Sequence, residues 1–271
     1  IGPYQYLQGR FASGSDRFQF NAHGSRSDGY RDDTGYDQYK VTTNLSTNQG
    51  KWKAVHTFSA TRLNQETGGY VKGELAYKDS TVRRTNPNPE AYRDATSIRV
   101  ASHWSLEQAA REWSVAPYVR QSDMEFRQHF LPGKPLEKND QTSLGVITRV
   151  KGSATNTRWL AGAQVETMRG GLSERQNQPT TGSAYLVGTR PEGTHYDYEI
   201  SSFLIAAFYD LGWDIAENVE FIHSVRLERL NYDYDNRHLD GNSRDDGSAC
   251  GFGGCLYTRP ADREDDFTDV A

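Results

Sequence analysis

The stretch Arg17-Phe18-Gln19-Phe20-Asn21-Ala22-His23-Gly24-Ser25 decides the fold of this chain. Apolar or small side chains occupy every second position, and each residue between them is polar. Successive side chains of a β-strand point to opposite faces of its sheet. The period of two therefore predicts a strand with one apolar face and one polar face.

The same alternation returns along most of the chain, in segments of about ten residues separated by turn-forming stretches. A weak first strand lies near Tyr4–Phe11, and Tyr198–Tyr209 is predicted as a strand although it is apolar on both faces. In total, about ten strands are predicted. The apolar positions of the regular segments include Tyr39, Val41, Leu45, Trp52, Ala54, Phe58, Ile98, Val100, Trp104, Trp113, Val115, Val119, Leu144, Val146, Val150, Trp159, Ala161, Val165, Val219, Phe221, Val225 and Leu227.

The connections between these segments alternate in length. The short connections are predicted at Ser13–Asp16, Asn48–Lys51, Glu107–Arg111, Gly152–Asn156 and Asp210–Asn218. The long connections are predicted at Ser27–Tyr36, Leu63–Asp94, Met124–Asp140, Gly170–Asp197 and Arg237–Asp266. This rhythm is typical of outer-membrane barrels, with tight periplasmic turns and long extracellular loops. We therefore predict an all-β, antiparallel, up-and-down transmembrane β-barrel.

The tryptophans provide an independent indication. Trp52, Trp104, Trp113, Trp159 and Trp213 all lie beside or within the short connections. An indole favours the bilayer interface, so five of five at one rim indicate a periplasmic aromatic girdle. The alternative is that bulky residues simply close the hairpins. Two histidines, His56 and His223, fall on the lipid-facing parity and are expected near the interface or in a local bulge.

Composition excludes several classes of protein. Hydrophobic residues make up 35% of the 271 residues and the mean hydropathy is −0.82, yet 12% are aromatic, which argues against disorder. The mixed charge, with a net value of −5, argues against a nucleic-acid partner. The longest apolar run, Phe203–Tyr209, is far shorter than the roughly 18 residues of a membrane-spanning helix.

Motifs for catalysis are absent from the sequence. It contains no Gly-x-Ser-x-Gly elbow, no P-loop and no His-Glu-x-x-His pair. The seven histidines are scattered, so neither a metal site nor a cofactor is predicted. The Asp-rich loops around Asp28 and Asp233 do not match an EF-hand, because Arg237 occupies the third ligand position of the second loop. The chain is therefore predicted not to be an enzyme.

The two cysteines, Cys250 and Cys255, flank a glycine-rich stretch of four residues. Such a stretch can bend into a small disulfide loop in an oxidising compartment. The alternative is a metal-binding pair, but neither a histidine nor a second cysteine pair lies at ligand spacing. We therefore predict a disulfide.

Three stretches resemble TonB-dependent outer-membrane receptors of the siderophore type. They are Gly24–Asp33, similar to the first long loop after the plug; Arg83–Asp94, similar to a loop and strand start of that family; and Asp266–Ala271, similar to the start of a mid-barrel strand. In that family, a barrel of roughly 22 strands surrounds an N-terminal plug. The resemblance implies that residues 10–271 supply about ten of those strands, an incomplete barrel, and that residues 1–9 form the plug exit or the start of the first strand.

The resemblance also implies a function and partners. The parent protein would take up a scarce nutrient, first of all a ferric siderophore, across the outer membrane of a Gram-negative bacterium. TonB–ExbB–ExbD would drive uptake through the plug, which is missing from these residues. Two other functions remain open: a passive porin-like or adhesin barrel, and a soluble all-β ligand-binding module.

Candidate ligand-binding residues lie in the predicted extracellular loops, where binding residues concentrate. Guanidinium groups pair with carboxylate or catecholate oxygens, and tyrosine rings stack on planar ligands. The alternative for these residues is contact with lipopolysaccharide. The candidates are Tyr30, Arg31, Tyr70, Tyr77, Arg83, Arg84, Tyr92 and Arg93. A second set faces the predicted lumen, either to contact the plug and line the path or to form a structural ladder with Glu166, Glu220 and Glu228: Arg99, Arg120, Arg149, Arg158 and Arg226.

Overall fold

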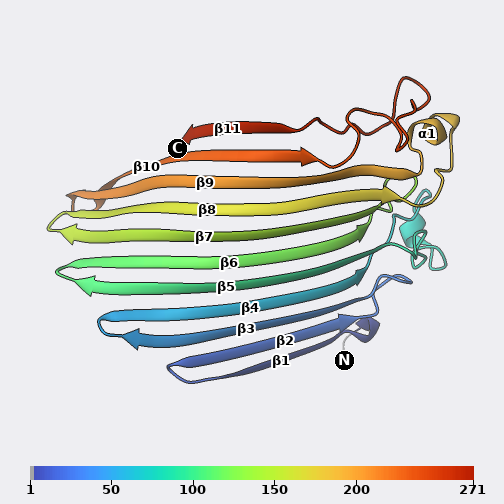
Figure 1. Cartoon of the computed structure of the whole chain (residues 1–271). Helices are drawn as coiled ribbons and strands as arrows, with labels where there is room; N and C mark the ends of the chain where they lie inside the picture. The colour runs from blue at the N-terminus through green and yellow to red at the C-terminus, as the bar shows by residue number, and fades with distance from the viewer. Residues whose placement is uncertain (1–2) are drawn as a thin grey trace.

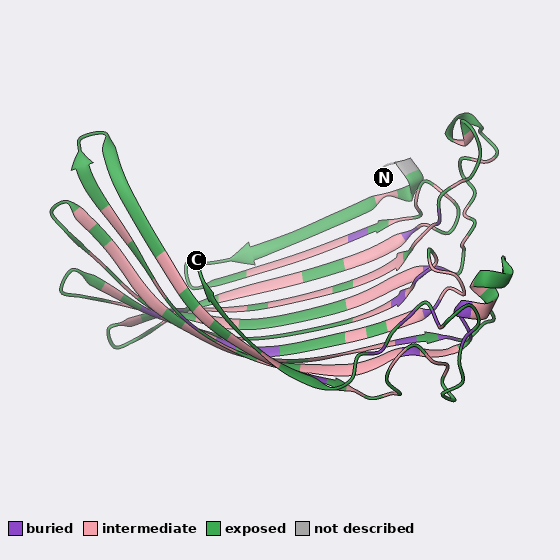
Figure 2. Cartoon of the chain, turned by 90° about the horizontal axis from the view of Figure 1, so that it is seen from above, coloured by how far each residue is buried: buried purple, intermediate pink, exposed green. Residues whose placement is uncertain are grey.

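A computed structural model describes residues 3–271, and across these residues the chain forms one antiparallel sheet of eleven strands. The strand order follows the chain from β1 to β11 without a crossover (Figure 1). The sheet bends into an open trough (Figure 2). This is the up-and-down topology that the sequence predicts, in a partial barrel.

The strands lengthen from the N-terminus toward β9, which has 24 residues. In the described chain, one 3-10 turn precedes β1, and a second 3-10 turn and a single short α-helix lie in the connections. The bounds are η1 Pro3–Gln5, β1 Leu7–Gly14, β2 Phe18–Ser27, β3 Tyr36–Gln49, β4 Trp52–Glu66, η2 Ala76–Lys78, β5 Tyr92–Gln108, β6 Arg111–Arg127, β7 Leu136–Ala154, β8 Thr157–Gln176, α1 Ala184–Thr189, β9 Gly193–Ala216, β10 Val219–Asn236 and β11 Arg263–Val270.

The predicted rhythm of connections is confirmed. The tight turns that close the hairpins β1–β2, β3–β4, β5–β6, β7–β8 and β9–β10 all lie at one end of the sheet, on the left of Figure 1. The long connections lie at the other end. No helix among residues 3–271 is long and apolar enough to cross a membrane. The prediction for residues 1–9 falls partly on Ile1 and Gly2, which lie outside the described residues.

The strands extend further than the sequence predicts, and the long loops are correspondingly shorter. The connection predicted at Met124–Asp140 is reduced to residues 128–135, and the one predicted at Gly170–Asp197 to residues 177–192. The backbone ladder continues there because its hydrogen bonds do not depend on the side chains. Both faces of the sheet carry polar residues in these extensions, so the alternation ends before the strand does.

One face of the sheet carries an uncovered apolar band. Directly paired residues share a face, and the register places Phe58 beside Val100, Val100 beside Val119, and Val119 beside Leu144. Val100 is 50% exposed although the strands on both sides of it are paired. No second layer packs on these residues in the described chain. The band has the character of a lipid-facing surface.

The edges of the band run obliquely across the sheet. Trp104 pairs with Val115, two residues above Trp113, and Trp159 pairs with Leu211, two residues above Trp213. These four tryptophans therefore shift toward the short turns from β5 to β9, whereas Trp52 of β4 lies next to the row of Leu106 and Trp113 and does not follow the shift. When strands tilt relative to the barrel axis, residues at one membrane height fall on successively shifted rows of paired residues. The geometry agrees with a tilted barrel wall that carries its indoles at one rim.

The two histidines of the apolar face lie near the short-turn end, as expected. The ring nitrogens of His56 lie 2.9 Å from Thr47 Oγ1 and 2.8 Å from Ser102 Oγ, and its ring packs edge-on against Trp104. The hydroxyl of Tyr209 lies 3.1 Å from His223 Nδ1. Local hydrogen bonds thus satisfy polar rings on this face, which lowers the cost of placing them there.

Candidate functional site

The opposite face of the sheet, the lumen wall, carries a ladder of paired charges. Arg120 forms an ion pair with Glu166, which also accepts a hydrogen bond from the hydroxyl of Tyr118. Arg158 pairs with Glu220 in the same manner. A third pair joins Arg226 Nε to Glu228 Oε2 at 2.7 Å. These contacts support the structural-ladder interpretation for three of the five lumen arginines. The other two, Arg99 and Arg149, are exposed.

Two glycines flatten this wall. A Cβ atom at Gly145 would lie 2.5 Å from the phenol end of Tyr118, and one at Gly162 would lie 2.4 Å from the ring of Phe208. Glycine at both positions lets the neighbouring aromatic ring lie down across the strand, where any larger residue would push it away. The wall therefore stays smooth at these positions.

Two of the long loops, residues 28–35 and 67–91, are joined by hydrogen bonds. The guanidinium of Arg31 donates to the carbonyl of Thr85 from Nε at 3.0 Å and from Nη2 at 2.8 Å. The backbone N–H of Asp32 donates to the carbonyl of Arg84 at 2.8 Å. Arg31, a predicted ligand-binding residue, thus ties the two loops together.

Arg84, in the second of these loops, lies beside two tyrosines. The guanidinium carbon of Arg84 lies 5.6 Å from the ring centroid of Tyr30 and 5.7 Å from that of Tyr4. The two rings meet edge to face at 5.3 Å. No acid among the described residues pairs with Arg84. The guanidinium lies beside both rings while its N–H groups remain available, an arrangement suited to a carboxylate or another oxyanion.

The other predicted binding residues do not join this cluster. Tyr70 is 75% exposed with Lys72 over its ring, Tyr77 is exposed with Lys78 over its ring, and Arg83 is exposed. The placement of Tyr92 and Arg93 in the loop was wrong, because β5 already begins at Tyr92. Being successive strand residues, they point to opposite faces: Tyr92 bonds to Glu125, and Arg93 lies 4.6 Å from the ring centroid of Phe126.

A second loop assembly joins residues 177–192 with residues 237–262. Cys250 and Cys255 form a disulfide there. Backbone N–H groups of Gly251 and Leu256 donate to the carbonyls of Gly188 and Thr189, at 2.9 Å each. The disulfide loop is therefore tied to the end of α1, and the two loops form one unit.

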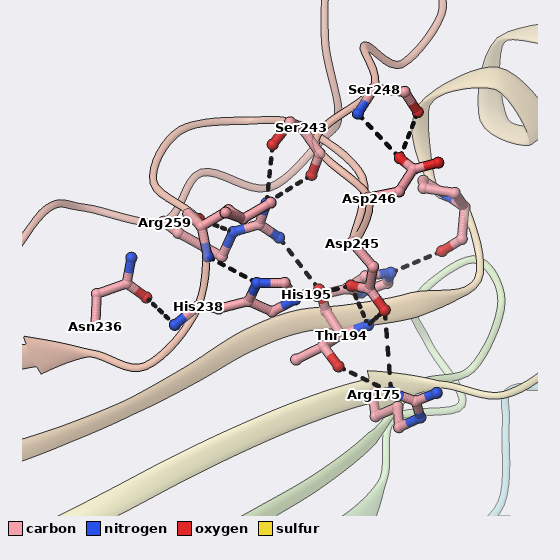
Figure 3. Close-up of polar contacts among 12 residues, drawn as sticks. Arg175, Thr194, His195, Asn236, His238, Ser243, Asp245, Asp246, Ser248 and Arg259 are labelled. Atoms are coloured by element: carbon pink, nitrogen blue, oxygen red, sulfur yellow. Dashed lines mark hydrogen bonds and ion pairs between the residues drawn. The ribbon is translucent and has the colours of Figure 1, made fainter.

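This unit encloses a buried polar network (Figure 3). Arg259, 1% exposed, donates to the carbonyl of Ser243 at 2.7 Å and to that of Thr194 at 3.2 Å. His195 is fully buried and lies 2.9 Å from Glu174 Oε1. Sequence reasoning missed this network, because single polar residues in long loops carry no periodic signal.

The environment shifts two pKa values in this unit. Burial raises the pKa of the Tyr257 hydroxyl, whose ring stacks on His195 at 4.3 Å between centroids. Hydrogen bonds from the side chain and backbone of Ser248 lower the pKa of Asp246, which is exposed to solvent. No group of three or more His, Cys, Asp or Glu side chains in the described part of the chain is arranged to hold a metal ion.

Comparison with solved structures identifies the fold. The whole chain matches 49% of the ferric-catecholate import receptor Fiu of E. coli K12, with a TM-score of 0.66 and 11% identity. It also matches, over 99% of its length, 41% of the ferric yersiniabactin uptake receptor FyuA of Yersinia pestis, with a TM-score of 0.64 and 13% identity. Likewise, 99% of it matches 40% of the copper transporter OprC, with a TM-score of 0.66 and 12% identity.

The similar structures are TonB-dependent receptors for siderophores and metals, which agrees with the resemblance seen in the sequence. They are transport receptors rather than enzymes. The chain spans about half of their length or less. No protein-family model and no curated protein matches the sequence itself. At these identities the likeness establishes the fold alone.

Proposed function

We propose that the chain forms part of the wall and rim of an outer-membrane, TonB-dependent receptor that takes up a scarce nutrient, in the first place a ferric siderophore. The observation that carries this proposal is the oblique apolar band, edged by tryptophans, on the back of a polar and smooth lumen wall. A band of this kind suits a barrel in lipid, and a sheet that stays open after eleven strands suits a barrel large enough to hold a plug.

The fold neighbours support a nutrient as the ligand. Fiu imports ferric catecholates, FyuA takes up ferric yersiniabactin, and OprC transports copper. Arg84, which lies beside two tyrosine rings, favours an anionic chelate over a bare cation, because a guanidinium attracts oxyanions and repels metal ions. A ferric complex with acidic oxygens meets this requirement.

The mechanism requires no covalent chemistry. The rigid loops and the plug bind the chelate at the extracellular rim, and TonB–ExbB–ExbD rearranges the plug at the expense of the inner-membrane gradient. The ion-paired ladder on the lumen wall holds its charges in place during this movement, because each guanidinium already has a carboxylate partner.

Uptake of radioactive iron tests the proposal. The full-length protein is expressed in a Gram-negative strain that lacks its own siderophore receptors, and accumulation is measured with ferric catecholate, hydroxamate and citrate complexes. We expect accumulation of one class only, and only in the presence of TonB. Arg84→Ala should weaken binding of that complex roughly tenfold or more. Its matched control, Arg83→Ala, should have little effect.

The alternatives give different results. Accumulation that does not require TonB would identify a passive porin-like pore. Absence of uptake together with adherence to surfaces would identify an adhesin. A detergent-free monomer that neither enters membranes nor shows heat-modifiable mobility would identify a soluble binding module.

A further inference from the structure

The stretch Tyr198–Tyr209 is apolar on both faces, and the lipid-facing band explains only one of them. Phe203 and Ile205 lie on the band, paired with Thr167 and Val165 of β8. Ile200 and Leu204 therefore point to the lumen wall. Apolar residues on a wall that is otherwise polar require an explanation of their own.

The neighbouring strands extend this lumen patch. The register places Ile200 beside Tyr234, Leu204 beside Leu230, and Leu230 beside Phe267. All of these residues share the lumen face with the charged ladder, but they lie toward the long loops. The polar wall of the earlier strands thus gives way to an aromatic and aliphatic wall on β8–β11.

A cavity of about 440 Å³ opens on this patch. Its size lies within the range of ordinary small-molecule pockets. The rings of Tyr232 and Phe267 are nearly parallel, 5.6 Å apart and inclined by 7°, beside it. The lining is Met168, Ile200, Leu230, Tyr232, Tyr234 and Arg263, completed by Ser202 and Pro260. Flat tyrosine faces and a thioether floor suit a planar ring.

One end of the cavity is cationic. Arg263 Nη2 donates to the hydroxyl of Tyr232 at 2.5 Å, and Arg263 Nε lies 2.8 Å from Asp265 Oδ2. These two contacts fix the guanidinium and leave its Nη1 group for a further acceptor. Because Asp265 offsets part of the charge, the site favours one acidic oxygen in the correct position over a highly charged anion.

We propose that this cavity binds a planar aromatic ring that carries an acidic oxygen, of the hydroxybenzoate or catechol class. The ring lies against Tyr232, Tyr234 and Met168, and its oxygen accepts a hydrogen bond from Arg263. The inference rests on the proposed function, since the ring would be the aromatic part of the chelate. The cavity lies on the lumen wall below the loops, so it provides a second contact, separate from Arg84.

Binding of simple probes tests the site without transport. The full-length protein in detergent is titrated with 2,3-dihydroxybenzoate, phenol and cyclohexanecarboxylate, and binding is measured by calorimetry. We expect the dihydroxybenzoate to bind and cyclohexanecarboxylate to bind at least tenfold more weakly, because the flat cavity favours a ring with π-faces. Arg263→Met should weaken binding of the acid roughly 10- to 100-fold and leave phenol unchanged.

Two further variants guard against misfolding. Met168→Trp fills the cavity and should abolish binding of both aromatic probes, while Tyr232→Phe removes only one hydroxyl. Arg229→Met is the matched control, because Arg229 lies on the opposite face of β10 and pairs there with Asp266. Each variant must keep the heat-modifiable mobility of a folded barrel before its binding is compared.

The outcomes separate the site from the function. Binding of dihydroxybenzoate that persists unchanged in Arg263→Met and Met168→Trp overturns the site, as does the absence of aromatic binding in the unmodified protein. A segment of the same polypeptide that fills the cavity would give that second result. If the variants leave TonB-dependent iron uptake intact, the proposed binding site is refuted and the proposed receptor function is supported. If aromatic probes bind but no uptake occurs, the proposed binding site is supported and the proposed receptor function is refuted.

Discussion

Replacing Val100 by arginine tests whether the apolar face of the sheet lies in lipid. Val100 is midway between Trp104, at the girdle, and Thr96, the first polar residue beyond the band on the same face of β5. It is half exposed, so the substitution removes little protein packing. In water, such a change would alter the free energy of unfolding by about 0.5 kcal/mol or less.

The expected magnitude follows from the position of Val100. The eight residue steps from Trp104 to Thr96 span about 27 Å of strand, or about 21 Å of height at a strand tilt of about 40°. This is close to the height of about 25 Å for the apolar band of outer-membrane barrels, so Val100 lies near the midplane. An arginine there should destabilise the protein by about 2–4 kcal/mol, whereas Thr96→Arg should change it by about 0–1 kcal/mol.

The assay is a urea titration of the full-length protein folded into phosphatidylcholine vesicles, followed by tryptophan fluorescence. Heat-modifiable mobility confirms that each variant starts from a folded barrel. The difference between Val100→Arg and Thr96→Arg is the quantity of interest, because both add the same side chain to the same face of one strand. Equal stabilities for the two variants would refute the assignment of this face to lipid.

Three other perturbations follow from the structure. Gly145→Ala should lift the ring of Tyr118 off the lumen wall and destabilise the barrel by about 1–3 kcal/mol in the same titration; Gly9→Ala, which meets no atom within 4 Å, should be neutral. Cys250→Ser, which opens the small disulfide loop, should cost the loop unit about 2 kcal/mol, seen as faster proteolysis within residues 237–262 while the barrel stays folded. Because burial raises the pKa of Tyr257 above its ordinary value of 10.0, the neutral phenol stabilises the folded unit below that pH, and proteolysis there should accelerate as pH rises through the folded pKa.

The sequence predicts the features that repeat. Alternation at Phe18, Phe20 and Ala22 identifies a strand with two unlike faces because lipid and lumen impose that difference on every turn of the pleat. The turn positions follow from the ends of these segments. In the half of β8 near the long loops, neither lipid nor lumen acts on the side chains. The alternation disappears there while the backbone pairing continues. Strand ends, and hence the placement of Tyr92, were therefore out of reach.

Loop packing could not be predicted for a different reason. Arg259 follows Tyr257 and Thr258 in a stretch with no period, and its acceptors are carbonyls of Leu239, Ser243 and Thr194. Its burial depends on two loops meeting, which no local pattern records. The disulfide between the two cysteines could be predicted, because they lie only five positions apart in the sequence. Of the predicted binding residues, the ones that the structure gathers, Tyr30 with Arg31 and Arg84, lie in two loops that flank adjacent strands.

In strand β10, the face that carries the apolar residues changes along the strand, so the environment at each height determines it. Toward the short turns, Val225 and Leu227 lie on the outer face and Arg226 and Glu228 on the lumen wall. Beyond Glu228 the apolar residues change sides without a bulge: Leu230, Tyr232 and Tyr234 face the lumen, and the outer positions become polar from Arg229 onward. The polar outer positions are explained by the end of the lipid band. Contact with lipid on the outer face does not explain aromatic residues on the lumen face. Serine or threonine would suit a lumen face that contacts only water or a polar surface. An aromatic ring bound in the cavity beside Arg263, as proposed above, accounts for their presence there.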